Sequence, residues 1–472
     1  MADELHWRSA RALAGAIRDR ELSAREVVAA HLGRIERVNP RLNAIVTLDP
    51  ERALAEADAA DARQARGEPL GPLHGLPVAV KDLEDTAGMR TTYGSALFAE
   101  HVPAADGLLA ARLRAAGAIV VGKTNTPEFG VGSHTFNEVF GATRNPWAPD
   151  RSAGGSSGGA GAALAAGLVP LADGSDHGGS IRNPASFNHV VGLRPTPELV
   201  PSPSPEPGDV WDPSAVLGPM ARTIGDLSLM LSAIAGPDRR APLSHGDPAA
   251  FRHAPEASDP RTLRIGWWPD VGGLPIEPAV AAVLERARER LIAAGATVEE
   301  VAPDVSRADE AFETLRALGF ARAFGGRLPE LRRRSKATLV WNVERGLELD
   351  GPAVARAQRA RAEIFTRFVE LFERFDLIVA PAAQVTPFPI EAEYPRKVAG
   401  VRMHHYLEWM RACTRITVCG HPVLAVPAGF TPGGLPVGMQ LVGRFRGDRE
   451  LLAHGAAWEA ATGFADRHPA GF

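Results

Sequence analysis

Short apolar runs rich in β-branched residues alternate with helical patterns along this 472-residue chain. Residues 76–80 and 118–122 are typical of buried strands, and the apolar spacing of residues 108–116 between them is helical. The alternation returns at the ranges 262–266, 278–294, 353–375 and 376–380. This order of elements predicts an α/β fold with a substantially parallel or mixed sheet.

The first 70 residues read as helices. Ser23 is placed to cap a helix and Glu26 to complete a capping box, and the residues that follow have helical apolar spacing. Two proline-rich stretches, 195–213 and 236–261, have the composition of extended surface connections. The first of them could also act as a lid, and the sequence leaves both alternatives open.

Composition excludes several classes of protein. The 52 Lys and Arg residues against 56 Asp and Glu give a net charge of −4, so there is no basic excess for binding nucleic acid. The two cysteines, Cys413 and Cys419, are too few for a disulfide framework and fit a reducing compartment. With no apolar run near the length of about 20 residues of a membrane helix, and no signal-peptide pattern at the start, we expect a cytoplasmic protein that does not bind membranes.

Glycine is concentrated in residues 151–180, where nine of thirty residues are glycine against 48 in the whole chain. Ser156 lies in Gly-Gly-Ser-Ser-Gly-Gly, and Ser180 follows Gly178 and Gly179. The spacing fits neither a phosphate-binding loop, a dinucleotide fingerprint nor a Gly-x-Ser-x-Gly elbow. Taken alone, the segment is either a flexible loop or a place where the backbone must approach another group closely.

Lysine is rare, since only four of the 52 basic residues are lysine (Lys81, Lys123, Lys336 and Lys397). Lys81 stands at the end of the predicted strand 76–80, where burial would lower its pKa. Lysine can lose its proton and arginine effectively cannot, so a lysine here suggests a base. The alternative is a surface lysine paired with Asp82.

Six sequence blocks together resemble the amidase signature family: VAVKD, GGSSGG, SDHGGSIRNPASF, VVGLRPT, GPMARTIGDL and HPVLAVPAGFTPGGLPVGMQLVG. They cover about residues 70–235 and 376–445, whereas 240–370 matches weakly. The resemblance implies a single α/β/α domain whose large twisted mixed sheet is covered by helices on both faces. We divide it into an N-terminal helical segment (1–70), the signature core (71–235), a variable helical or inserted region (236–375) and the C-terminal part of the core (376–472).

The resemblance also implies the chemistry. Lys81 matches the catalytic lysine, Ser156 the bridging serine that follows a cis peptide bond, and Ser180 the nucleophile. The backbone N–H groups of four residues match the oxyanion hole: His177, Gly178, Gly179 and Ser180. A serine is a weak nucleophile that needs a base, and glycines let backbone donors face a developing oxyanion. No metal or organic cofactor is required.

Other residues are expected in supporting roles. Asp176 and Arg182 flank the predicted nucleophile and are expected to hold its loop, while Ser157 is expected to form a hydrogen bond nearby. Lys123, Asn125 and Glu128 belong to a turn that we interpret as structural, and both cysteines as buried thiols. The residues predicted to contact substrate are Phe129, Gly130, Trp211, Trp341 and Tyr406.

The resemblance predicts an amidase that forms an acyl-enzyme, acting on small aryl or apolar amides with ester or carbamate activity besides. The alternative is the catalytic, glutamine-hydrolysing subunit of a tRNA-dependent amidotransferase. In that branch Tyr-Gly-Arg-Val-Ser-Arg follows a Lys-Pro-Thr turn, whereas residues 194–201 here are RPTPELVP, which argues against it. A non-catalytic binding protein is disfavoured because all three catalytic residues are present. A small-molecule substrate is the expected partner; the sequence does not determine the oligomeric state, and a homodimer is only a guess.

Overall fold

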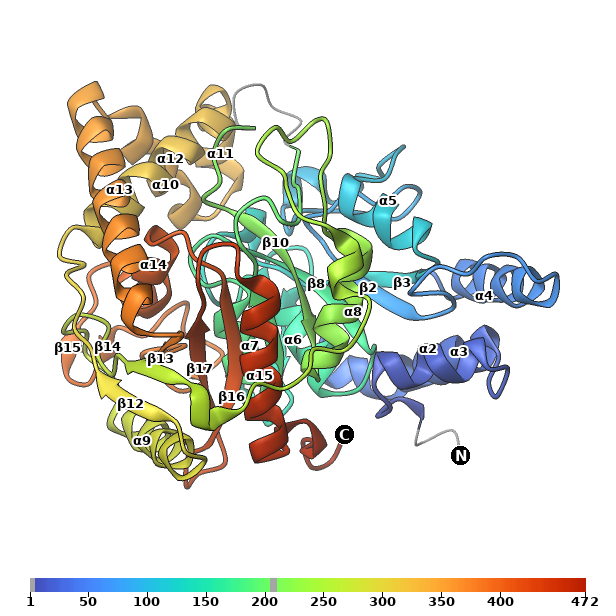
Figure 1. Ribbon diagram of the computed structural model, residues 1–472. Helices are drawn as coiled ribbons and strands as arrows, with labels where there is room; N and C mark the ends of the chain where they lie inside the picture. The colour runs from blue at the N-terminus through green and yellow to red at the C-terminus, as the bar shows by residue number, and fades with distance from the viewer. Residues whose placement is uncertain (1–4, 204–209) are drawn as a thin grey trace.

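The computed structural model describes residues 5–203 and 210–472. Within them the chain forms an eleven-stranded mixed sheet (Figure 1). From one edge to the other, the strands are β1 (Ile45–Leu48), β3 (Ile119–Thr124), β2 (Pro77–Lys81), β8 (Leu171–Asp176), β10 (Val216–Ala221), β9 (Val191–Arg194), β16 (Val423–Phe430), β17 (Pro436–Val442), β13 (Leu377–Pro381), β11 (Arg264–Trp267) and β12 (Thr297–Glu300). Strand β2 is parallel to β3 and β8, and β11 is parallel to β12 and β13, whereas the remaining pairs are antiparallel.

The strands are apolar on both sides because both faces of the sheet are covered. Successive residues of a strand point to opposite faces. Accordingly, Val78 and Val80 belong to one hydrophobic cluster and Ala79 to another, and in β13 Leu377 and Ile378 divide in the same way. This explains why the strands read as continuous apolar runs instead of alternating polar and apolar residues.

Helices form a layer over each face. One face packs against α2 (Ala10–Arg18), α5 (Leu108–Ala115), α8 (Ile224–Ile234), α9 (Pro278–Ala293) and α15 (Asp448–Thr462). The other packs against α4 (Pro50–Ala65), α6 (Gly158–Ala165), α7 (Arg182–Asn188), α13 (Gly351–Arg374) and α14 (Arg411–Val418), and α3 (Ala24–Val38) contributes to the clusters of both faces. The predicted α/β/α class with a large mixed sheet is therefore confirmed.

Smaller elements complete the chain. Helices α10 (Ala308–Phe324), α11 (Leu328–Arg334) and α12 (Ala337–Leu347) gather beside α13 (Figure 1). The short two-stranded ladders are β4 (Phe136–Asn137) with β5 (Gly141–Ala142), β6 (Arg144–Asn145) with β7 (Ala148–Ser152), and β14 (Lys397–Val398) with β15 (Val401–Arg402). The region 236–375 is built into the sheet, since it supplies β11 and β12.

The N-terminal prediction holds with one exception. The Ser23–Glu26 capping box at the start of α3 is present. The prediction that residues 1–70 form only helices is wrong at Ile45–Leu48, which form strand β1 antiparallel to β3. This short apolar run covers the outer edge of β3, whose backbone groups would otherwise lack partners.

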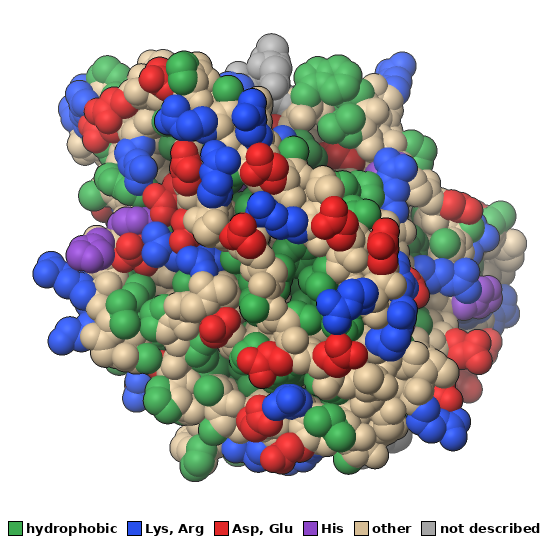
Figure 2. Space-filling model, turned by 60° about the vertical axis from the view of Figure 1, so that its left-hand side comes forward, with side chains coloured by type: hydrophobic (Ala, Val, Ile, Leu, Met, Phe, Trp, Pro, Cys, Tyr) green, Lys and Arg blue, Asp and Glu red, His purple; other side chains and the backbone are tan. Residues whose placement is uncertain are grey.

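The surface matches the near-neutral charge balance. Figure 2 shows acidic and basic side chains interspersed on the face in view. Among the described residues, no helix has both the length and the apolar character needed to cross a membrane.

Helices α10 and α12 approach so closely that one contact leaves no room for a side chain. A Cβ atom added at Gly346 of α12 would lie 2.0 Å from the carbonyl oxygen of Ala317 in α10. At Gly319 of α10, an added Cβ would meet nothing within 4 Å.

These two glycines give a matched pair of substitutions. We expect Gly346→Ala to force the helices apart and to destabilise the fold by about 1–3 kcal/mol, the usual cost of overpacking. Gly319→Ala should instead be neutral or stabilising by up to about 1 kcal/mol, because alanine favours a helix. Urea denaturation midpoints measure both, and equal midpoints for the two variants would contradict the close approach.

Candidate active site

Lys81 lies at the end of β2, the third strand from one edge of the sheet, and its side chain is fully buried. Its Nζ atom is 2.7 Å from the hydroxyl oxygen of Ser156. It is also 2.9 Å from the hydroxyl oxygen of Ser157 and 2.9 Å from that of Ser175. The alternative of a surface lysine paired with Asp82 is therefore excluded.

Burial lowers the pKa of the Lys81 amine to about 7, although the carboxyl groups of Asp173 and Glu84 act in the opposite direction. A protonated lysine can only donate to its three hydroxyl neighbours. A neutral amine has two N–H groups and one lone pair, so it would donate to two hydroxyls and accept from the third. The geometry around Nζ accommodates that neutral form.

Ser156 follows a cis peptide bond from Gly155 and begins the turn into α6. The glycine before it is sterically required, because a Cβ atom at Gly155 would lie 2.9 Å from the backbone nitrogen of His134. Gly130 approaches from the other side, where an added Cβ would lie 3.4 Å from the Ser156 hydroxyl oxygen. The Ser156 hydroxyl is thus held between Lys81 and the 129–130 turn.

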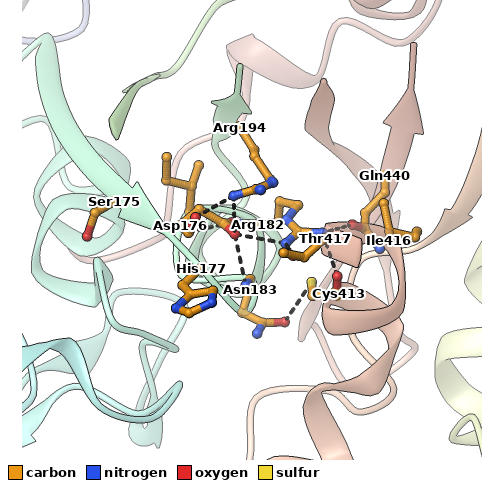
Figure 3. A network of polar contacts seen from close by, with 12 residues as sticks. Ser175, Asp176, His177, Arg182, Asn183, Arg194, Cys413, Ile416, Thr417 and Gln440 are labelled. Atoms are coloured by element: carbon orange, nitrogen blue, oxygen red, sulfur yellow. Dashed lines mark hydrogen bonds and ion pairs between the residues drawn. The ribbon is translucent and has the colours of Figure 1, made fainter. Parts of the chain in front are cut away.

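The loop from Asp176 to Ser180 connects β8 to α7, and the Asp176 carboxylate organises it (Figure 3). This carboxylate accepts the N–H groups of Gly179 at 3.0 Å and Ile181 at 3.1 Å. It also forms an ion pair with the Arg182 guanidinium at 2.8 Å and lies 3.6 Å from that of Arg194. Burial would raise the pKa of Asp176, but the two guanidinium groups outweigh it and hold that pKa well below its usual range.

Arg182 extends this network to distant parts of the chain. Its guanidinium donates to Thr417 Oγ1 at 2.7 Å and to Gln440 Oε1 at 2.7 Å (Figure 3). Both groups lie more than 200 residues further along the chain, on α14 and β17. The loop is therefore tied to the C-terminal half of the sheet as well as to β8.

Ser180 is buried, and the N–H group of Ser157 donates to its carbonyl oxygen at 3.1 Å. Within the described part of the chain, the Ser180 hydroxyl makes no hydrogen bond, and the N–H groups of His177, Gly178 and Ser180 have no acceptor. Gly179 differs from the expectation for an oxyanion donor, because its N–H is engaged by Asp176. Gly179 has a φ of 109°, and a Cβ there would lie 2.6 Å from that of Cys413.

The predicted substrate contacts divide into three groups. Phe129 lies beside Gly130, and its ring centroid is 4.9 Å from that of Phe324 on α10. Trp341 and Tyr406 contact each other, with ring centroids 5.9 Å apart. Trp211 is 65% exposed.

Tyr406 is connected to the loop through Arg316 of α10. The Tyr406 hydroxyl accepts from the Arg316 guanidinium at 3.3 Å, and that guanidinium also lies 3.3 Å from Nδ1 of His177. Arg316, His177 and Phe324 line a hollow of about 160 Å³ in front of the loop. The loop thus borders this aromatic and cationic hollow through His177.

The residues interpreted as structural are all in the interior. Lys123 contacts Thr86 Oγ1 at 2.8 Å, Asn125 Nδ2 donates to Thr143 Oγ1 at 3.1 Å, and Glu128 accepts from the Ser95 hydroxyl at 2.7 Å. Both cysteines are buried free thiols.

Sequence reasoning missed several groups that contact the predicted residues. Ser175 touches Lys81, and Asp173 accepts the Lys81 backbone N–H at 2.7 Å. Both lie in β8, a buried strand in which three of the six residues are polar, so a signal was present. Arg194, Thr417 and Gln440 gave a weaker sequence signal. Each is only a single polar residue within or beside a buried strand.

The comparisons with known proteins place the chain in a family. The Amidase family model matches residues 26–452. The acylamidase of Rhodococcus erythropolis is 36% identical over 99% of this chain and 98% of its own length. A glutamyl-tRNA(Gln) amidotransferase subunit of Moorella thermoacetica is 37% identical over 99% of each chain. Among solved structures, a bacterial aryl acylamidase of the amidase signature family superposes with a TM-score of 0.91, at 29% identity and 99% coverage of each chain.

The chain therefore belongs to the amidase family. Its relatives include the two acylamidases described above, and it is an amide hydrolase that acts on carbon–nitrogen bonds.

The ion pairs of Asp176 predict the result of one substitution. Asp176→Asn leaves the buried guanidinium groups of Arg182 and Arg194 without a compensating charge, so we expect a loss of about 3–5 kcal/mol of stability. The denaturation midpoint and the amidase activity should both fall. The control is Asp259→Asn, which breaks an exposed pair with Arg261 and should leave the midpoint unchanged. Equal midpoints for the two variants would contradict this role of Asp176.

Proposed function

We propose that the chain hydrolyses amides through an acyl-enzyme on Ser180, with Ser156 and Lys81 as the proton relay. The observation that carries the proposal is the buried Lys81 amine at 2.7 Å from the Ser156 hydroxyl. Neutral Lys81 accepts the proton of Ser156, and Ser156 accepts that of Ser180 as the Ser180 oxygen attacks the substrate carbonyl carbon. A serine activated by an adjacent base is the general form of such nucleophilic catalysis.

The negative charge that develops on the carbonyl oxygen needs donors that are already in place. The backbone N–H groups of His177, Gly178 and Ser180 are free to serve, and one such donor contributes about 3–4 kcal/mol to transition-state stabilisation. Gly179 instead supports the loop through its hydrogen bond to Asp176. In this proposal the oxyanion donors are therefore three, and Gly179 is a positioning residue.

The collapse of the tetrahedral intermediate breaks the carbon–nitrogen bond and leaves the acyl group on Ser180. The proton held by Lys81 returns through Ser156 to the departing amine. Water then attacks the acyl-enzyme, giving one proton to the same relay, and the carboxylic acid leaves as the Ser180 hydroxyl is restored. The relay ends each cycle in its initial protonation state.

For the substrate we propose small aryl or apolar amides, with esters and carbamates as further substrates. The support comes from two aromatic pairs, Phe129 with Phe324 and Trp341 with Tyr406, and from the acylamidase of Rhodococcus erythropolis as a relative. An apolar acyl or aryl group gains free energy by leaving water for such aromatic rings. A small-molecule substrate is then the only partner that the reaction needs. Assembly of the chain into a homodimer is a separate prediction.

A second candidate function is the glutamine-hydrolysing subunit of a tRNA-dependent amidotransferase. The relative from Moorella thermoacetica favours it, at 37% identity over 99% of both chains. The proline-rich sequence after Thr196 departs from the motif of that branch and favours an enzyme that acts alone. Turnover of an anilide without turnover of glutamine by the purified chain would separate the two.

Ser180→Ala tests the nucleophile. We expect kcat for acetanilide to fall by roughly 10⁴-fold or more, the scale of losing the serine nucleophile of a hydrolase. The release of aniline measures this, with an ester, a carbamate and glutamine assayed beside it. The matched control, Ser306→Ala at an exposed position, should retain full activity. A loss of only a few-fold in Ser180→Ala would refute the assignment.

The pH dependence tests the base. Because burial lowers the pKa of Lys81 to about 7 and the neutral amine is the active form, kcat/KM should rise with pH and level off above that value. The rise should be about tenfold per pH unit on the acidic side. Lys81→Met should abolish activity throughout. A profile that is flat across this range, with chemistry rate-limiting, would exclude neutral Lys81 as the base.

A further inference from the structure

A cavity of about 480 Å³ borders the Asp176–Ser180 loop at His177 and lies between α10, α13 and the segment 194–198. Its size is in the range of small-molecule sites. None of Lys81, Ser156 and Ser180 lines it, and His177 is its one contribution from the Asp176–Ser180 loop. Figure 1 shows α10 and α13 side by side, next to α14, whose C-terminal end closes the cavity. The cavity is therefore separate from the catalytic hydroxyls.

The walls of this cavity are mostly apolar. Phe312 and Leu315 enter from α10, Phe365 from α13, and Leu243 and Phe445 from the surrounding loops. An occupant must match these walls with an apolar body, because an apolar surface buried against them leaves water favourably.

One acid in the cavity wall lacks a partner. Glu198 is only 8% exposed, and its buried Oε2 atom has no hydrogen-bond partner in the described part of the chain. Buried polar atoms in folded proteins are generally paired, since an unpaired one has lost its hydrogen bonds to water. Burial also raises the pKa of the Glu198 carboxyl to about 7. A bound molecule with an N–H or O–H group would supply the missing donor.

The charges around the cavity restrict the ligand further. Arg194, Arg361 and Arg446 line the same walls as Glu198. A cation would be repelled by the three guanidinium groups, and an anion would meet the Glu198 carboxylate. Arg194 is already engaged by Asp176, and Arg361 lies 3.4 Å from the Ser214 hydroxyl. Two buried atoms of these lining residues lack a partner in the described part of the chain, the acceptor Glu198 Oε2 and the donor Arg194 Nε. A neutral N–H or O–H group satisfies the first without charge repulsion, and its own lone pair can accept from the second.

We propose that this cavity is a second ligand site, which binds a neutral apolar molecule carrying an N–H or O–H donor, of the arylamine class, with Glu198 as its acceptor. This site is distinct from the serine–lysine site and does not depend on the proposed reaction. It touches the Asp176–Ser180 loop directly through His177, and indirectly through Arg194, which pairs with Asp176.

The test measures binding of 4-chloroaniline to the full chain by isothermal titration calorimetry at mildly alkaline pH. We expect Glu198→Leu to weaken binding by about tenfold or more, the factor for a lost hydrogen bond to a charged group. Ala362→Trp places a large ring in the cavity mouth and should weaken binding comparably. The control Glu300→Leu, an exposed glutamate outside the cavity, should bind as the parent does, and Phe324→Ala reports instead on the hollow that His177 also lines.

The outcomes separate the proposal from its alternatives. Binding that survives both Glu198→Leu and Ala362→Trp, or that is lost in Phe324→Ala, would place the arylamine elsewhere and overturn the site. If Glu198→Leu fails to fold, as judged by its thermal midpoint, Ala362→Trp decides. Benzoate and benzylammonium serve as the anionic and cationic probes. Tighter binding of either one, lost in Ala362→Trp, would overturn the ligand class.

Discussion

The buried carboxylate of Asp176, held between the guanidinium groups of Arg182 and Arg194, is the interaction on which the rest of the site depends. It joins the end of β8, the start of α7 and strand β9, and through Arg182 it reaches α14 and β17. A buried ion pair contributes little net stability compared with apolar packing, because desolvating the charges is costly. This ion pair instead orients the loop. The Asp176 carboxylate accepts N–H groups at fixed positions, and this determines where the remaining N–H groups of the loop point.

The sheet and its covering helices bury the Lys81 amine. Strands on both sides and helices on both faces remove the amine from water, and this desolvation lowers its pKa. The nearby carboxyl groups of Asp173 and Glu84 limit the decrease, because their charges favour the ammonium form. The pKa of this amine is thus set by the balance between an apolar sheet and two buried acids, and β2 supplies the apolar surroundings because it lies between β3 and β8.

Much of this arrangement could be predicted from the sequence where the signals were local. The apolar strand ending at Lys81, the glycine-flanked serines and the capping box at Ser23 are all patterns within a few residues. Strand β1 was missed because four residues beside helical segments carry too short a pattern, and pairing with β3 decides their conformation. The contacts of Arg182 with Thr417 and Gln440 join segments more than 200 residues apart, which only the order of strands in the sheet brings together. The hydrogen bond from the Gly179 N–H to Asp176 depends on the conformation of the loop, which the residue types alone do not predict.

Helix α10 packs directly against the Asp176–Ser180 loop. An added Cβ atom at Gly178 would lie 3.1 Å from the Phe312 ring, so this helix packs directly on the predicted oxyanion segment. The same helix lines both the hollow of about 160 Å³ and the cavity of about 480 Å³, and His177 borders both spaces. The loop is anchored from the sheet side by Asp176, Arg182 and Arg194, whereas its surroundings are shaped by helices from the region 236–375. A change in α10 can therefore reshape both spaces while the ion pairs that hold the loop stay intact.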